Sequence, residues 1–189
     1  MNYFLNIEDC TLLGSGAEGA VYLTPEGYAI KVFRNASLAQ KEEEILNIAA
    51  SSGYFPKSII RISNILIREY VSGDNLYEYI FKNGLSYKLS VQIIDLIEDY
   101  KRLNFKRLNT RNAHIFVNSK EKLMVIDPRK PFSKETPYPK DIIKTLCKLH
   151  VYDKFLKDLT SYNPKLLPYW TDGYKYVSNS RKRRFYRYG

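Results

Sequence analysis

Residues 12–33 read LLGSGAEGAVYLTPEGYAIKVF and contain a G-x-G-x-x-G-x-V pattern, followed on the next β-prone run by Ala29-Ile30-Lys31. In a dinucleotide-binding fold such glycines open a helix, and the N-terminus of that helix holds a pyrophosphate. Here the glycines are followed by two β-prone runs, 20–24 and 28–33, around a Pro/Gly turn. The pattern therefore predicts a β-hairpin and not a helix.

The glycines and the lysine of this hairpin suit phosphate binding, because glycine lets backbone N–H groups approach phosphate oxygens without a Cβ in the way. A glycine loop inside a hairpin, with a lysine on the next strand, resembles the phosphate-covering arrangement of the protein-kinase-like family. The resemblance implies that Lys31 reaches the α- and β-phosphates of ATP. The alternative is an ordinary glycine-rich hairpin with a surface lysine. The residues that the resemblance assigns to the nucleotide here are Gly14, Ser15, Gly16, Gly19, Val21, Ala29 and Lys31. Of these, Val21 would cover the base.

The chain of 189 residues is long enough for one domain or two small lobes. Its 30 Lys and Arg against 20 Asp and Glu give a net charge of +10, which favours polyanionic partners such as nucleotides, RNA, ribosomes or acidic proteins, or simply a solvated basic surface. The only cysteines, Cys10 and Cys147, lie far apart, which fits a reducing cytoplasm. We find no apolar run that could span a bilayer, no signal peptide and no Cys/His cluster with zinc spacing.

Residues 37–50, SLAQKEEEILNIAA, predict a helix with Ser37 as its cap. In the kinase family a glutamate on this helix pairs with the strand lysine and holds it toward the phosphates. The family's spacing places that glutamate three residues before an Ile-Leu pair, which selects Glu42. Glu43 and Glu44 are the alternatives, and an acidic solvated face is the plain interpretation of all three.

Two more strands are expected at 59–63 and 65–71. Residues 68–80, REYVSGDNLYEYI, closely resemble the kinase hinge and the helix behind it. In that family the hinge backbone forms hydrogen bonds with the adenine edge. The resemblance therefore implies main-chain contacts to adenine at Glu69 and Val71.

Leu85 to Phe105 is the clearest helix, because its apolar residues recur at three- and four-residue spacing. A short hairpin follows and ends near Asp127, which falls where the kinase family has the metal-binding aspartate of D-F-G. Pro128 and Arg129 replace the Phe and Gly of that motif. A buried carboxylate needs a partner, and a Mg²⁺ ion bridging phosphates would supply one. An Asp-Pro turn is the alternative.

The loop before this hairpin departs from the kinase pattern H-R-D-L-x-x-x-N. Alignment by the following strand places Asn109 at the catalytic aspartate, Arg111 near the γ-phosphate and His114 at the metal-binding asparagine. Asn109 cannot accept a proton, although it can orient a hydroxyl, and phosphoryl transfer depends mainly on positioning and charge neutralisation. His114 could ligate a metal, but nitrogen suits Mg²⁺ less well than oxygen. The site therefore either catalyses weakly or binds nucleotide without transfer.

Little chain remains after Asp127. Helices are expected at 140–149 and 152–160, and residues 163–173, with the only tryptophan, are expected to form a packed connector. The sequence has no A-P-E motif, and the loop that follows Asp127 is short. In both respects the chain resembles RIO-type and other compact, bacterial-type kinase-like proteins. The basic, aromatic tail 181–189 suits contact with RNA or a ribosome, an anionic membrane surface, or no partner at all.

We therefore expect an α+β, two-lobed protein-kinase-like fold with a truncated C-terminal lobe. Residues 1–70 would form the N-lobe and 71–189 the reduced helical C-lobe. The predicted function is that of an atypical cytoplasmic phosphotransferase of serine/threonine type, with ATP and Mg²⁺ as cofactors and a protein or small molecule as acceptor. The alternatives are a pseudokinase that acts as a nucleotide-dependent scaffold, and an RNA- or ribosome-associated binding protein. The predicted catalytic residues are Lys31, Glu42, Asn109, Arg111 and Asp127, and the predicted metal ligands are Asp127 and His114.

Overall fold

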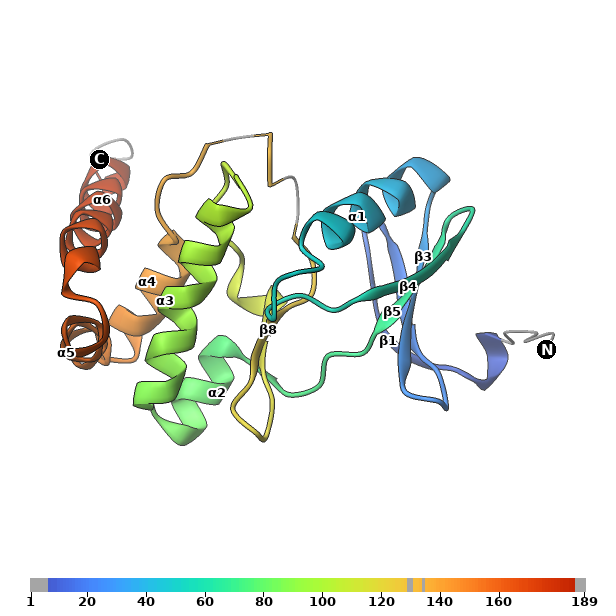
Figure 1. Cartoon of the computed structure of the whole chain (residues 1–189), viewed down its shortest axis with the longest axis horizontal. Helices are drawn as coiled ribbons and strands as arrows, with labels where there is room; N and C mark the ends of the chain where they lie inside the picture. Colours follow the sequence, from blue (N-terminus) through green and yellow to red (C-terminus); the bar gives the residue numbers. More distant parts are fainter. Residues whose placement is uncertain (1–6, 129–130, 134, 186–189) are drawn as a thin grey trace. The chain divides into compact units, whose positions relative to one another are not determined.

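The computed structural model describes residues 7–128, 131–133 and 135–185, with side chains as far as residue 179. The chain has the α+β class that the sequence predicts, with a five-stranded antiparallel sheet and helices (Figure 1). It divides into two compact units. The first consists of Met1–Ser72 and Met124–Asp127, and the second of Gly73–Leu123 and Pro128–Gly189.

Five antiparallel strands form the sheet of the first unit, in the order β1 (Thr11–Gly16), β2 (Gly19–Leu23), β3 (Tyr28–Phe33), β5 (Ile65–Glu69) and β4 (Ser58–Ile62). A short 3-10 helix, η1 (Ile7–Asp9), precedes them. The predicted hairpin is confirmed, because β2 pairs with β3 around a turn at residues 25–27. One helix, α1 (Ala36–Ile48), connects β3 to β4 and packs on the sheet through the buried side chains of Ala39 and Leu46 (Figure 1).

The cap of α1 differs from the predicted one. The side chain of Asn35, and not that of Ser37, accepts a hydrogen bond from the backbone N–H of Leu38, with an Oδ1–N distance of 3.0 Å. Asn35 has the extended backbone that a capping residue needs, whereas Ser37 already lies in the first turn of the helix. The prediction of Ser37 as the cap is therefore wrong.

Gly19 is required by the close approach of β3. A Cβ at this residue, whose φ is +153°, would lie 1.9 Å from the carbonyl oxygen of Val32. Gly14 and Gly16 differ, because a Cβ at either would have no heavy atom within 4 Å. The packing of the sheet therefore explains the third glycine of the motif and does not explain the first two.

We expect Gly19→Ala to lower the free energy of unfolding by about 2–4 kcal/mol, because β3 must shift away from the new methyl group. The matched control is Gly16→Ala, which we expect to change it by about 0.5 kcal/mol or less. Urea denaturation followed by circular dichroism measures both. Equal values for the two variants would contradict the close approach of β2 and β3 at Gly19.

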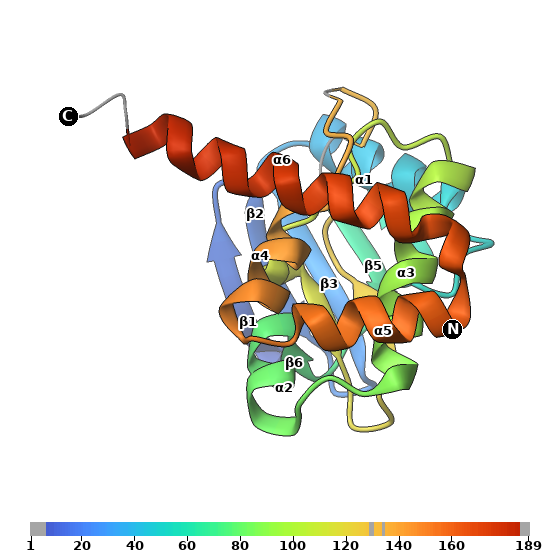
Figure 2. The same ribbon diagram turned by 90° about the vertical axis from the view of Figure 1, so that its left-hand side faces the viewer.

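The second unit is mainly helical. Its central helix, α3 (Tyr87–Arg102), lies within the predicted range of 85–105 and buries Leu89, Ile93 and Ile97 completely. The other elements of this unit are β6 (Asp74–Asn75), α2 (Leu76–Asn83), η2 (Asn112–His114), β7 (Ile115–Val117), α4 (Lys140–Lys148), α5 (Tyr152–Tyr162), η3 (Pro164–Leu166) and α6 (Leu167–Phe185). Strand β8 (Leu123–Val125) has its first residue in this unit and its other two residues in the first unit. Strand β6 pairs with β7, and the three short strands have the order β6-β7-β8. Figure 2 shows α5 and α6, which pack against α3 and α4 respectively.

The expected connector at residues 163–173 is instead helical. It forms η3 and the first turns of α6, so the prediction of a connector is wrong. The two prolines, Pro164 and Pro168, stand at the first or second position of their helices, where a missing N–H costs no hydrogen bond. Trp170 is fully buried.

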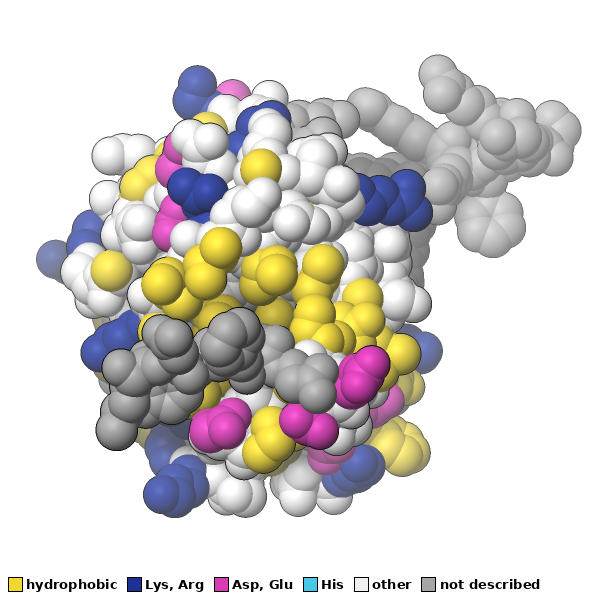
Figure 3. Space-filling view, turned by 90° about the vertical axis from the view of Figure 1, so that its right-hand side faces the viewer, with side chains coloured by type: hydrophobic (Ala, Val, Ile, Leu, Met, Phe, Trp, Pro, Cys, Tyr) yellow, Lys and Arg dark blue, Asp and Glu magenta, His cyan; other side chains and the backbone are white. Residues whose placement is uncertain are grey.

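Several large hydrophobic side chains of the first unit are exposed. Ile59, Ile60 and Ile62 of the edge strand β4 are 51%, 48% and 60% exposed, and Leu12 of the other edge strand, β1, is 56% exposed. Figure 3, which views the right-hand side of Figure 1, shows hydrophobic side chains gathered in a band. Ala29 and Lys31 of β3 and Leu66 and Arg68 of β5 are buried and share one face of the sheet, and two of these four residues are charged.

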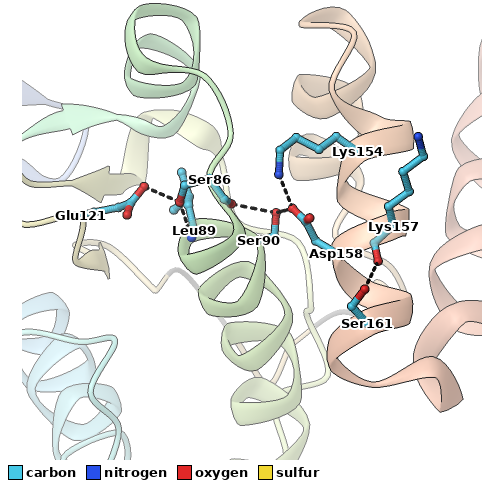
Figure 4. A network of polar contacts seen from close by, with 8 residues as sticks. All are labelled: Ser86, Leu89, Ser90, Glu121, Lys154, Lys157, Asp158 and Ser161. Carbon is cyan, nitrogen blue, oxygen red and sulfur yellow. Dashed lines mark hydrogen bonds and ion pairs between the residues drawn. The ribbon is translucent and has the colours of Figure 1, made fainter.

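A polar network in the second unit ties α3 to α5 (Figure 4). Ser86 caps α3, because its Oγ accepts from the N–H of Leu89 at 2.9 Å, and the same hydroxyl donates to Glu121 at 2.5 Å. One turn later Ser90, which is fully buried, donates to the carboxylate of Asp158 on α5 at 2.6 Å. The network satisfies the polar atoms that the packing of these two helices buries.

Candidate functional site

A buried ion pair joins β3 to α1. The Nζ of Lys31 donates a hydrogen bond to Oε2 of Glu42, and each residue is only 7% exposed. The predicted pairing of these two residues is therefore present. The two alternative glutamates have other partners, since Glu43 binds Arg61 at 2.6 Å and Glu44 accepts from Gln40 at 2.9 Å.

Simple periodicities bring the two charges together. On β3, Lys31 alternates with its neighbours and lies opposite Leu66 of β5 and Val21 of β2. On α1, Glu42 belongs to the buried stripe that also contains Ala39 and Leu46, at three- and four-residue spacing. The stripe that attaches the helix to the sheet therefore also delivers a carboxylate to the lysine.

A second buried cation, Arg68 on β5, belongs to the same group. Arg68 is 4% exposed, and its Nε lies 3.9 Å from Oε1 of Glu42. Neither of these two atoms has a hydrogen-bond partner among the described residues. None of the sequence motifs predicts a role for Arg68. The alternation of β5 could have revealed it, because Arg68 stands two residues after the buried Leu66 and so shares its face.

Asp127 completes the group. Its Oδ1 lies 3.8 Å from Nζ of Lys31, and its side chain is 15% exposed. The segment Met124–Asp127 belongs to the first unit, although it lies within the residues assigned to the predicted C-lobe, and the N–H of Val125 donates to the carbonyl of Tyr54 at 2.7 Å. We call Lys31, Glu42, Arg68 and Asp127 the charged cluster. It contains two cations and two carboxylates.

Burial shifts the pKa of two groups of the charged cluster, Glu42 and Arg68. It raises the pKa of the Glu42 carboxyl, against the opposing effect of Lys31 and Arg68. It lowers the pKa of the Arg68 guanidinium, against the opposing effect of Glu42 and Asp127. Each group therefore depends on its neighbours to keep its charge in the protein interior.

The glycine run lies beside the charged cluster in the sheet. Gly14 pairs with Val21, Val21 pairs with Lys31, and Lys31 pairs with Leu66, so these four residues form one row across four strands. Ser15 and Gly16, like Gly14, are exposed, and a two-residue turn separates Gly16 from Gly19. An exposed segment with two glycines therefore lies in line with the buried lysine.

The predicted main-chain contacts of the hinge are partly engaged within the protein. The N–H of Glu69 donates to the carbonyl of Lys57 at 3.0 Å, and the carbonyl of Glu69 accepts from Nη1 of Arg68 at 3.2 Å. A carbonyl oxygen has two lone pairs, so one acceptor position of Glu69 remains for a ligand. Val71 is buried.

The other predicted catalytic residues lie in the second unit. The side chain of Asn109 binds Asp141 of α4 twice, since its Oδ1 accepts from the backbone N–H of Asp141 at 2.8 Å and its Nδ2 donates to the carboxylate at 3.2 Å. The N-cap of α4, Pro139, makes no capping bond of its own. Asn109 therefore caps this helix from a distant part of the chain.

Arg111 is exposed and directly precedes η2, and its carbonyl accepts from the N–H of His114 at 2.9 Å.

Within residues 7–128, 131–133 and 135–179, no group of three or more His, Cys, Asp and Glu is arranged to hold a metal ion. The side chains of the basic tail 181–189, and residue 129, lie outside what the structure describes. Among the described residues no helix has both the length and the apolar character needed to cross a membrane.

A comparison of the sequence with protein-family models and with curated proteins gives no match.

Proposed function

We propose that the chain is an atypical protein-kinase-like phosphotransferase that binds a nucleoside triphosphate, expected to be ATP, with Mg²⁺. The charged cluster carries this proposal. Buried ionic groups stabilise a fold weakly, and hydrophobic residues of similar volume often serve as well or better. Lys31 is held by Glu42, and its Nζ lies 3.8 Å from Oδ1 of Asp127. This arrangement suits the binding of phosphate groups by the lysine.

The fold supports the same proposal. The element order, with one helix between the third and fourth strands of an antiparallel sheet and a helical second unit, is the order that the resemblance implies. In this function the open backbone at Gly14 and Gly16 and the ammonium of Lys31 would bind phosphate oxygens. Val21 and Ala29, which flank Lys31 in the sheet, would contact the base.

The residues fit a Mg²⁺ ion that arrives with the nucleotide. Mg²⁺ is commonly bound by one or two carboxylates together with substrate phosphates, and Asp127 offers one partly exposed carboxylate. Bound there, the ion would neutralise phosphate charge. His114 offers only a nitrogen, which Mg²⁺ prefers less, so Asp127 is the ligand that we assign.

A nucleotide-dependent scaffold is the second candidate. It is favoured by the state of Asn109, whose carboxamide uses both polar atoms to hold Asp141 and has no proton-accepting group for an incoming hydroxyl. Phosphate transfer to protein and small-molecule acceptors, measured with labelled nucleotide, separates the two candidates. Turnover supports the enzyme, and binding without turnover supports the scaffold.

Calorimetric titration with Mg·ATP tests the nucleotide site. We expect Lys31→Met to weaken binding about 10- to 100-fold, because one charged hydrogen bond to phosphate is lost. We expect Asp127→Ala to remove the dependence of binding on Mg²⁺. The matched control is Lys41→Ala on the exposed face of α1, which should bind as the wild type does. If neither ATP nor GTP binds the wild type at millimolar concentration, the proposed function is wrong.

A further inference from the structure

Arg68 lies on the face of the sheet that the proposed nucleotide would use. It pairs with Ala29 across β3 and β5, two positions along from the pair of Lys31 with Leu66. Side chains two apart on a strand share a face, so Ala29, Lys31 and Arg68 lie on the same face of the sheet. If Lys31 binds the phosphates and Ala29 contacts the base, Arg68 is the next side chain along that face.

The guanidinium of Arg68 is already directed at the hinge backbone. Its Nη1 donates to the carbonyl of Glu69 at 3.2 Å, and Glu42 lies on its other side, 3.9 Å from Nε. The carbonyl of Glu69 is the acceptor that the 6-amino group of adenine would use. Arg68 therefore uses one of the two lone pairs of the Glu69 carbonyl, and its guanidinium places further hydrogen-bond donors beside that carbonyl.

These donors suit a different base. A guanidinium donates and never accepts, so it cannot complement an amino group. On the edge that carries position 6 and N7, guanine presents two acceptors, O6 and N7. Arginine pairs with both of them through two N–H groups. Adenine presents an amino donor at position 6, and its matching side chains are the amides of asparagine and glutamine.

We propose that Arg68 makes the site selective for a 6-oxopurine nucleotide, such as guanosine triphosphate, over ATP. This inference rests on the proposed function, keeps its phosphate site and changes its expected base. The buried carboxylate of Glu42 contributes by holding the guanidinium in place from the side opposite the hinge.

Competition among three nucleotides on the full chain tests the inference. The Mg²⁺ complexes of GTP, inosine triphosphate and ATP are titrated by calorimetry into the wild type. We expect GTP and inosine triphosphate to bind about tenfold more tightly than ATP, which corresponds to one good polar contact. Inosine triphosphate lacks the 2-amino group of guanine, so its agreement with GTP assigns the preference to position 6.

Two substitutions assign the preference to Arg68. Arg68→Met removes the donors and should bring the GTP-to-ATP affinity ratio close to one. Arg68→Gln supplies the amide that matches adenine and should reverse the ratio in favour of ATP. Lys31→Met is the matched control, because it removes a phosphate contact and should weaken all three nucleotides equally.

The wild-type ratio can overturn the inference even if a variant fails to fold. ATP binding as tightly as GTP, or an unchanged ratio in Arg68→Gln, would overturn the role of Arg68 and leave the proposed function intact. No binding of any of the three nucleotides would overturn both.

Discussion

Replacement of Glu42 by alanine is expected to lower the free energy of unfolding of the first unit by about 3–5 kcal/mol. Removal of one partner from a buried ionic group leaves uncompensated charge in the protein interior, which costs far more than the group contributes when intact. Here one carboxylate serves two cations, Lys31 and Arg68, both less than 10% exposed. Asp127 would be the one carboxylate left in the charged cluster.

Glu43→Ala is the matched control for this prediction. It removes a neighbouring glutamate of the same helix. The side chain of Glu43 is 23% exposed, and that of its partner Arg61 is 29% exposed. Such partly solvated pairs contribute about 0.2–1 kcal/mol. Amide hydrogen exchange in β3 and β5 measures both variants within the first unit itself. A loss for Glu42→Ala no larger than that for Glu43→Ala would show that the charged cluster is solvated.

A quadruple variant separates stability from function. Glu42→Leu with Lys31→Met, Arg68→Met and Asp127→Asn replaces all four charges of the charged cluster by neutral groups, and neutral replacement of a whole buried ionic group is often neutral or stabilising. We expect the quadruple variant to regain most of the stability that Glu42→Ala loses and to bind no nucleotide. Recovery of folding without recovery of binding would indicate that these charges are present for a ligand.

The local part of the fold was predictable because it depends on short-range patterns. The Pro/Gly turn with β-prone runs on both sides predicted the hairpin, and the apolar repeat of residues 85–105 predicted α3. Glu42 was selected as the partner of Lys31 by the spacing that the kinase resemblance implies, with Glu43 and Glu44 as alternatives, and the structure contains this pair. The period of α1 explains the pairing, because Glu42 shares a buried stripe with Ala39 and Leu46.

Contacts between distant segments were not predictable in this way. Asn109 caps a helix that begins about thirty residues later, and nothing near Asn109 in the sequence indicates this partner. The burial of Arg68 follows from the alternation of β5, but nothing near Arg68 in the sequence indicates that Glu42 of α1 lies opposite its guanidinium. Pro164 and Pro168 suggested a connector, although proline is also favoured at the start of a helix.

Trp170→Ala is expected to have the largest effect in the second unit, lowering the free energy of unfolding by about 3–5 kcal/mol. Trp170 is fully buried, its ring centroid lies 4.6 Å from that of Phe155, and its carbonyl accepts from the hydroxyl of Tyr152 at 2.8 Å. Phe155 and Tyr152 both belong to α5. The indole therefore attaches α6 to α5, and alanine would leave a cavity between them.

Two controls distinguish this packing from a general sensitivity of the unit. Phe81→Ala removes a ring that is 71% exposed on α2 and should cost about 0.5 kcal/mol or less. Trp170→Phe should cost much less than Trp170→Ala. The smaller ring still fills most of the space, and the change removes an indole N–H that is buried without a hydrogen-bond partner among the described residues.

Because Trp170 is the only tryptophan, urea denaturation of these variants must be followed by circular dichroism. Similar losses for Trp170→Ala and Phe81→Ala would mean that α6 is held to α5 by other contacts, and the indole would then have no structural role that requires its burial.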